Sequence, residues 1–130
     1  MSASPAFKLP AMSLAVVGIA YPNRDGSDRK ANIARMQPGD AIELRPEPSN
    51  PKDKLAVAVF DGRDRQLGYV TAERAPRIGG LLREGREVRA VFQGVVQTGA
   101  WVRVAFDGEE PVVHEVSPGS DDADSADWGC

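Results

Sequence analysis

The sequence has very few of the side chains on which catalysis and metal binding usually depend. It holds one histidine, His114, and one cysteine, Cys130, among 130 residues. A single cysteine excludes an internal disulfide and a zinc site built on several thiolates, and it is typical of a reducing cytoplasm. No glycine-rich phosphate loop or nucleophile-elbow serine is present either. We therefore predict a cytoplasmic protein that is not an enzyme and uses no cofactor or metal.

Long apolar runs are also missing. The longest stretch without a charged residue or proline, residues 11–21, is about half as long as a membrane-spanning helix needs to be. Pro5 and Pro10 interrupt the region where a secretory signal would need an apolar segment. The sequence thus predicts no membrane contact. Its 42% hydrophobic residues are enough for the core of one domain.

Charge is distributed unevenly along the chain. Residues 107–130 hold eight acidic and no basic side chains, which leaves 16 basic and 11 acidic side chains in residues 1–106. The chain therefore combines a domain of net charge +5 with an acidic C-terminal segment. Such an asymmetry favours an anionic partner for the basic part, although two well-solvated surfaces would also explain it.

Short apolar segments at close spacing predict a mainly β protein. We expect strands at residues 14–21, 41–45, 55–60, 66–70, 87–94 and 100–106, and short helices at 29–36 and 71–84. Weaker strand character follows at 112–116. Two short helices cannot cover both faces of an open sheet, so a small β-barrel is favoured. The predicted organisation is a flexible leader at 1–11, a domain at 12–106 and an acidic, disordered tail at 107–130.

Several segments carry more detailed expectations. The Val-rich run at 14–21 is typical of a strand buried on both faces, and three prolines make residues 46–51 a stiff loop. Ser27 or Asp28 can cap the first helix and Thr71 the second. In the first helix, Arg29 is expected to point toward solvent. In a regular strand at 66–70, the side chain of Tyr69 would share a face with that of Leu67.

Three sequence patterns together resemble the HIRAN domain. The first is a Val-Val-Gly strand that ends in an aromatic residue, at 16–21. The second is a Pro-Gly-Asp turn at 38–40, followed by a rigid Asn-Pro-x-Asp loop at 50–53. The third is Leu-Gly-Tyr at 67–69, ahead of a helix. The resemblance covers residues 14–106, and the middle pattern together with Leu-Gly-Tyr is its most specific part.

The resemblance implies a modified OB-like barrel that binds DNA. In the best understood members, which are attached to fork-remodelling DNA translocases, the domain grips the 3′ end of a single strand. By this likeness, single-stranded DNA would be the partner, in DNA repair or replication-fork processing, with a helicase or nuclease as partner protein. The alternative is a protein-interaction module on the same barrel, with the acidic segment as its contact and no intrinsic nucleic-acid binding.

The resemblance also assigns candidate DNA-binding residues. Tyr21 matches an aromatic that stacks on the terminal base, and Asn50 and Asp53 match loop residues that hold the terminal nucleotide, with Asp53 accepting from the 3′-hydroxyl. Tyr69 matches a polar ring at the same site, and Phe92 a further aromatic. The well-studied binder has an aromatic where this chain has Lys52, so we expect weaker stacking and a larger share of charge, with Lys54 beside it.

The residues themselves leave structural alternatives open for each of these positions. Asn50 and Asp53 are also ordinary turn residues. Tyr21, at a strand end, is equally compatible with the rim of the core, and the strand patterns place Tyr69 and Phe92 toward the core. The acidic segment can be a solubilising tail, or it can fold over the basic face and compete with DNA.

Overall fold

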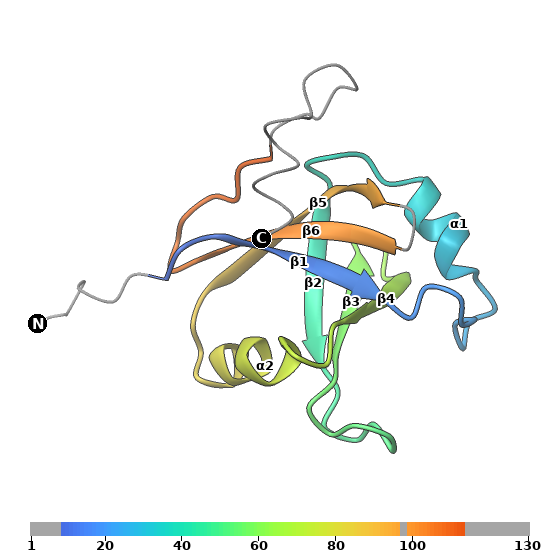
Figure 1. Cartoon of the computed structure of the whole chain (residues 1–130), viewed down its shortest axis with the longest axis horizontal. Helices are drawn as coiled ribbons and strands as arrows, with labels where there is room; N and C mark the ends of the chain where they lie inside the picture. Colours follow the sequence, from blue (N-terminus) through green and yellow to red (C-terminus); the bar gives the residue numbers. More distant parts are fainter. Residues whose placement is uncertain (1–8, 97–98, 114–130) are drawn as a thin grey trace, which may run out of the picture.

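The protein forms a closed barrel of six antiparallel strands (Figure 1). The computed structural model describes residues 9–96 and 99–113. The strands are β1 (Met12–Val17), β2 (Ala41–Pro46), β3 (Val57–Asp61), β4 (Gln66–Val70), β5 (Val88–Val96) and β6 (Gly99–Phe106), in the order β1-β4-β3-β2-β5-β6 around the barrel. Two short helices, α1 (Arg29–Ala34) and α2 (Ala75–Arg83), complete the described part. The predicted small, mainly β, OB-like barrel is confirmed.

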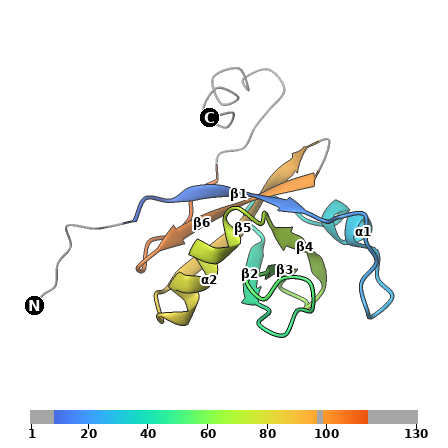
Figure 2. The same cartoon turned by 60° about the horizontal axis from the view of Figure 1, so that its bottom comes forward.

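The barrel interior is the hydrophobic core. Its largest fully buried side chains include Phe92, Phe106, Leu14 and Leu67 from the strands and Ile78 from α2. Helix α1 lies against β4, whereas α2 lies against β2 and β3. The two helices sit at different ends of the barrel in both views (Figures 1 and 2). Helix α1 thus packs against β4, the strand that carries Tyr69.

The first strand is shorter and less buried than its sequence predicts. β1 ends at Val17, whose side chain is 39% exposed, while Leu14 and Val16 point into the core. The strand stops because Gly18 has φ +72°, a left-handed conformation that favours glycine and turns the chain. The expectation of a strand over 14–21 buried on both faces is therefore wrong, and Tyr21 lies in the turn that follows.

Both helices also begin or end inside their predicted limits. Asp28 caps α1, as predicted, by accepting a hydrogen bond from the amide of Lys30 at 3.3 Å. The side chain of Arg29 is only 7% exposed, so its expected solvent orientation is wrong. Thr71 does not cap α2 with its side chain; its carbonyl accepts from the amide of Ala75, where the helix begins.

Ordered contacts continue past the predicted domain boundary at residue 106. Arg86 donates to both carboxylate oxygens of Asp107, at 2.9 and 2.8 Å, and Arg89 pairs with Glu110. The first acidic residues of the C-terminal segment are thus attached to the barrel. Residues 111–113 are not in a strand. His114, Cys130 and the rest of the predicted tail lie outside the described residues, as do residues 1–8 of the predicted leader.

Candidate nucleic-acid interface

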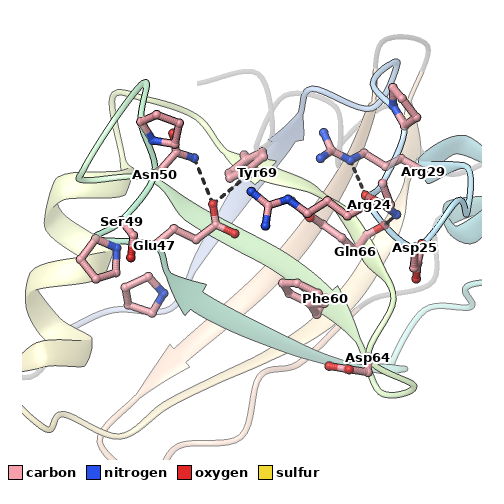
Figure 3. Close-up of a pocket in the computed structure, with 15 residues that line it drawn as sticks. Arg24, Asp25, Arg29, Glu47, Ser49, Asn50, Phe60, Asp64, Gln66 and Tyr69 are labelled. Atoms are coloured by element: carbon pink, nitrogen blue, oxygen red, sulfur yellow. Dashed lines mark hydrogen bonds between the residues drawn. The ribbon is translucent and has the colours of Figure 1, made fainter.

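Two adjoining grooves open beside β4. The first, here called the Tyr21 groove, has a volume of about 480 Å³. Its polar lining consists of Tyr21, Arg29, Asn50, Lys52, Asp53 and Tyr69, and its apolar lining includes Val17, Ala56, Val70 and Ala72. The second, the Phe60 groove, has a volume of about 720 Å³ and is shown in Figure 3. Arg29, Asn50 and Tyr69 line both grooves and form the ridge between them.

The loop that carries Asn50, Lys52 and Asp53 is held by its own side chains. The Asn50 side-chain oxygen accepts from the amides of Lys52 and Asp53, at 2.9 and 3.1 Å. One oxygen of Asp53 accepts from the amide of Leu55 at 2.9 Å. These are the turn contacts that short polar side chains favour. With Pro46, Pro48 and Pro51 restricting the backbone, they present Lys52 and Asp53 in one pre-set geometry.

Glu47 ties this loop to the barrel. Its Oε1 accepts from the Tyr69 hydroxyl at 2.8 Å and from the Asn50 side-chain amide at 3.0 Å (Figure 3). The Asn50 side chain therefore positions the loop through three local hydrogen bonds, one donated and two accepted. Sequence reasoning missed Glu47, because nothing local relates a glutamate in a proline-rich loop to a tyrosine on another strand.

A β-bulge turns Tyr69 out of the core and into the ridge. β3 and β4 pair Val59 with Gly68 but Phe60 with Gln66, so Leu67 is an extra residue on β4. Such a bulge breaks the alternation of faces. Leu67 is fully buried, whereas Tyr69 is half-buried and lines both grooves. The expectation that the two side chains share a face is wrong for this reason.

Gly18 and Gly68 bring the strands and turns of the site close together. A Cβ at Gly68 would lie 2.4 Å from the carbonyl oxygen of Val17, so only glycine lets β4 approach β1 here. A Cβ at Gly18 would lie 3.6 Å from Nη1 of Arg29, 3.8 Å from the Tyr69 ring and 4.0 Å from the Tyr21 ring. These three side chains therefore gather around the Gly18 turn.

Arg29 is the buried cation of the site. Its Nε donates to Oδ1 of Asn23 at 2.7 Å, and its Nη1 donates to the carbonyl of Gly18, also at 2.7 Å. Its guanidinium carbon lies 5.3 Å from the centre of the Tyr69 ring, within cation–π range. The sequence placed this residue on a solvated helix face, and no local signal distinguishes it from Lys30 or Arg35.

The predicted site residues are only partly brought together. Tyr21, Asn50, Lys52, Asp53 and Tyr69 line one groove, and Tyr21 is 66% exposed. Lys54 is exposed on the same loop but lines neither groove. Phe92 is 1% exposed in the barrel core, where its ring is not open to a ligand. The structure thus agrees with the core interpretation of Phe92.

The two grooves differ in charge. Among their lining residues, the Tyr21 groove has two cations, Arg29 and Lys52, and one carboxylate, Asp53. The Phe60 groove has Arg24 and Arg29 but three carboxylates, from Asp25, Glu47 and Asp64. Hydrogen bonds from the hydroxyl and amide of Ser27 lower the pKa of Asp25 and favour its charged form. Anions are therefore better accommodated in the Tyr21 groove.

Other kinds of site find little support in the described residues. Within residues 9–96 and 99–113, no three or more His, Cys, Asp or Glu side chains are grouped as a metal site would require. In the same part of the chain, no helix is long and apolar enough to cross a membrane.

Comparisons with known proteins agree with the barrel fold. A family model described as the HIRAN domain matches residues 11–107. The crystal structure of the HIRAN domain of human HLTF superposes with a TM-score of 0.60 at 19% identity, covering 74% of each chain. A protein from Lactobacillus plantarum superposes with the same TM-score at 21% identity, covering 75% of this chain and 93% of that one. A search of curated proteins found no match.

Proposed function

The chain belongs to the HIRAN domain family, a family of DNA-binding modules, and on this premise we propose that its Tyr21 groove holds the 3′-terminal nucleotide of single-stranded DNA. One observation carries the proposal: five of the seven site residues predicted from the sequence line one groove. They come from the Gly18 turn, the proline-rich loop and β4, which are far apart in the sequence. The proposed role is binding, with no chemical step.

The groove combines apolar, aromatic and cationic side chains, which match the sugar, base and phosphate of a nucleotide. Val17, Ala56, Val70 and Ala72 offer apolar area against which a base or sugar can be desolvated. The exposed ring of Tyr21 is available to stack on a base, an interaction that contributes about 1–3 kcal/mol per base. Lys52, which is exposed and lines the groove, supplies a cation for a phosphate.

Asp53 gives the proposed preference for an end. A carboxylate repels the phosphate backbone, so it belongs in a DNA site only where no phosphate follows. A terminal 3′-hydroxyl fits this requirement, because it can donate to the carboxylate. Asp53 is exposed, and only its Oδ1 accepts a hydrogen bond within the described residues. The second oxygen is thus available to a ligand.

The resemblance also suggests the biological setting. The best understood HIRAN domains are attached to fork-remodelling DNA translocases, and this chain resembles the stand-alone members of the family. We therefore place the proposed role in DNA repair or replication-fork processing, beside a separate helicase or nuclease. A protein-interaction module on the same barrel is the alternative that the experiment below must exclude.

A comparison of linear and circular single strands tests the proposal. Fluorescence anisotropy with a short labelled oligonucleotide should show binding that an unlabelled linear strand displaces well and a circular strand, which has no end, displaces poorly. Tyr21→Ala should weaken binding, whereas Val95→Ala, an equally exposed position outside both grooves, should not. Equal displacement by the linear and the circular strand would contradict the proposed preference for a 3′ end. If the protein binds no oligonucleotide at low salt, DNA is not its ligand, and the protein-interaction alternative is favoured.

A further inference from the structure

We propose that Arg29 is the phosphate-binding residue of the Tyr21 groove and receives the internucleotide phosphate next to the terminal nucleotide. This inference deepens the proposed function and rests on it. The likeness to HIRAN domains did not mark this position, and the sequence assigned it to solvent. The burial, the hydrogen-bond partners and the surroundings of the guanidinium support a phosphate-binding role.

The charge of Arg29 is buried without a counter-ion. The side chain is 7% exposed, and within the described residues no carboxylate lies within 4.0 Å of it. Two half-buried arginines of the barrel have such partners: Arg65 pairs with Asp61, and Arg86 with Asp107. Arg103, which donates to the neutral Ser13 hydroxyl, is more exposed than Arg29. Arginine is almost never fully buried unless paired, because desolvating an isolated charge is unfavourable. An anionic ligand would supply the missing charge.

The guanidinium is also held in a fixed orientation. Nε and Nη1 donate to the neutral oxygens of Asn23 and Gly18, and the plane approaches the Tyr69 ring. Within the described residues, no oxygen accepts from Nη2. Two donors are thus used for positioning, which leaves Nη2 without an acceptor in the described part of the chain, on a side chain that lines the groove. Arginine held in this way loses little freedom when it binds a phosphate.

A second layer of contacts fixes the acceptor that holds Arg29. The Asn23 side-chain amide donates to the Gln66 carbonyl at 2.8 Å and to the Ser27 hydroxyl at 3.0 Å. The buried Asn32 donates to the same carbonyl and the same hydroxyl, at 3.1 and 3.2 Å. The turn before α1 is therefore fastened to β4. Such support is what a binding residue needs in order to keep its geometry.

Charge decides from which side a phosphate reaches Arg29. On the Phe60 side of the ridge, the carboxylates of Asp25, Glu47 and Asp64 repel an anion. On the Tyr21 side, Lys52 offsets Asp53 and the net charge of the lining is positive. A phosphate therefore binds from the Tyr21 groove. With the terminal hydroxyl at Asp53, the nearest phosphate of the strand is the one before the last nucleotide.

A methylphosphonate scan tests this assignment. Each phosphate of a short oligonucleotide is replaced in turn by an uncharged methylphosphonate, and the affinity of the full-length protein is measured. Replacement at the last linkage should weaken binding to the wild-type protein at least about tenfold, the effect expected for a hydrogen bond to a charged group. Arg29→Gln should lose a similar factor with the unmodified strand and be insensitive to replacement at that linkage.

Arg103→Gln is the matched control. Arg103 is a half-buried arginine on β6 that donates to a neutral partner, the Ser13 hydroxyl, and lines neither groove. The Arg103→Gln substitution removes the same charge as Arg29→Gln but outside the grooves. This variant should therefore remain as sensitive as the wild type to methylphosphonate at the last linkage. If Arg29→Gln keeps that sensitivity too, the assignment is overturned, even though DNA binding itself stands.

Inorganic phosphate provides a second measurement that does not depend on DNA binding. In the wild-type protein, its titration should shift the NMR signal of the Arg29 Nε–H group, identified by its absence in Arg29→Gln, before the signals of other arginines. A wild-type protein that binds no oligonucleotide would contradict the proposed function. If phosphate shifts the Nε–H signal of Arg29 no more than that of Arg103, the assignment of Arg29 as a phosphate site is contradicted, whether or not the protein binds DNA.

Discussion

The hydroxyl of Tyr69 on β4 donates a 2.8 Å hydrogen bond to Oε1 of Glu47 in the proline-rich loop. The same oxygen accepts from Asn50, so one carboxylate connects the barrel wall to the loop that presents Lys52 and Asp53. The aromatic ring of Tyr69 meanwhile lies beside Arg29. Tyr69 thus supports the two parts of the site that we expect to contact DNA, without needing to contact it.

Tyr69→Phe tests this connection, because it removes the hydroxyl and keeps the ring. We expect a loss of about 0.5–1.5 kcal/mol in the free energy of unfolding, the usual contribution of one hydrogen bond. DNA affinity should fall as well, because the loop is no longer held against β4. Urea denaturation and anisotropy measure the two effects. An unchanged affinity would show that the loop keeps its geometry without Tyr69.

Asp53→Asn tests the recognition of the terminal hydroxyl. The wild-type protein should bind a 3′-hydroxyl strand at least about tenfold more tightly than a 3′-phosphate strand, because the phosphate would place two anions together and remove the donor. Asparagine can still accept from Leu55, so the loop should keep its shape. The variant should lose most of the discrimination in competition assays. If the wild-type protein binds 3′-hydroxyl and 3′-phosphate strands equally, Asp53 does not recognise the terminal hydroxyl.

Salt dependence tests the share of charge in binding. With Lys52 and Arg29 as the two phosphate contacts, the slope of log K against log salt should be about −1.4, since each contact on a single strand contributes about −0.7. Lys52→Gln should reduce the slope by one contact, whereas Lys54→Gln, on the same loop but outside the groove, should change it less. An affinity that does not fall with salt would contradict the electrostatic account.

Gly68→Ala tests the close approach of β4 to β1. The new methyl group would meet the Val17 carbonyl at 2.4 Å and Cγ1 of Val16 at 2.8 Å, so the strands must separate. We expect a loss of about 2–3 kcal/mol in stability. Gly62→Ala is the control, because nothing lies within 4 Å of its added methyl group and its φ is not positive. Its thermal midpoint should barely change, and a similar midpoint for Gly68→Ala would contradict the packing argument.

Truncation after Val113 tests the acidic C-terminal segment. This boundary keeps the ion pairs of Asp107 and Glu110, which a cut after Phe106 would remove together with the tail. At a salt concentration with a Debye length of about 8 Å, distant charges are screened, and we expect full-length and truncated proteins to bind DNA equally. Tighter binding by the truncated protein there would instead indicate a segment that folds over the basic face and competes with DNA.

Much of the fold was predictable because it depends on local patterns. Apolar runs between turn residues marked all six strands, and β4 was placed at its observed limits, residues 66–70. The loop containing Asn50 and Asp53 was recognised from its prolines and turn residues, and the structure shows those side chains making the turn contacts. The same short-range rules missed where β1 ends, because the Val-rich run continues past the glycine that stops the strand.

The sequence by itself determined the class of barrel, the stiff loop and five of the side chains that share the Tyr21 groove. Only the tertiary structure decided that Arg29 is buried, that Glu47 joins loop to barrel and that Tyr69 leaves the core face. Each of these depends on a contact between distant segments: the Asn23 side chain reaches a carbonyl 43 residues away, and one unpaired residue at Leu67 turns the face of β4. Burial and strand register arise from the packing of the whole chain, so local periodicity cannot specify them.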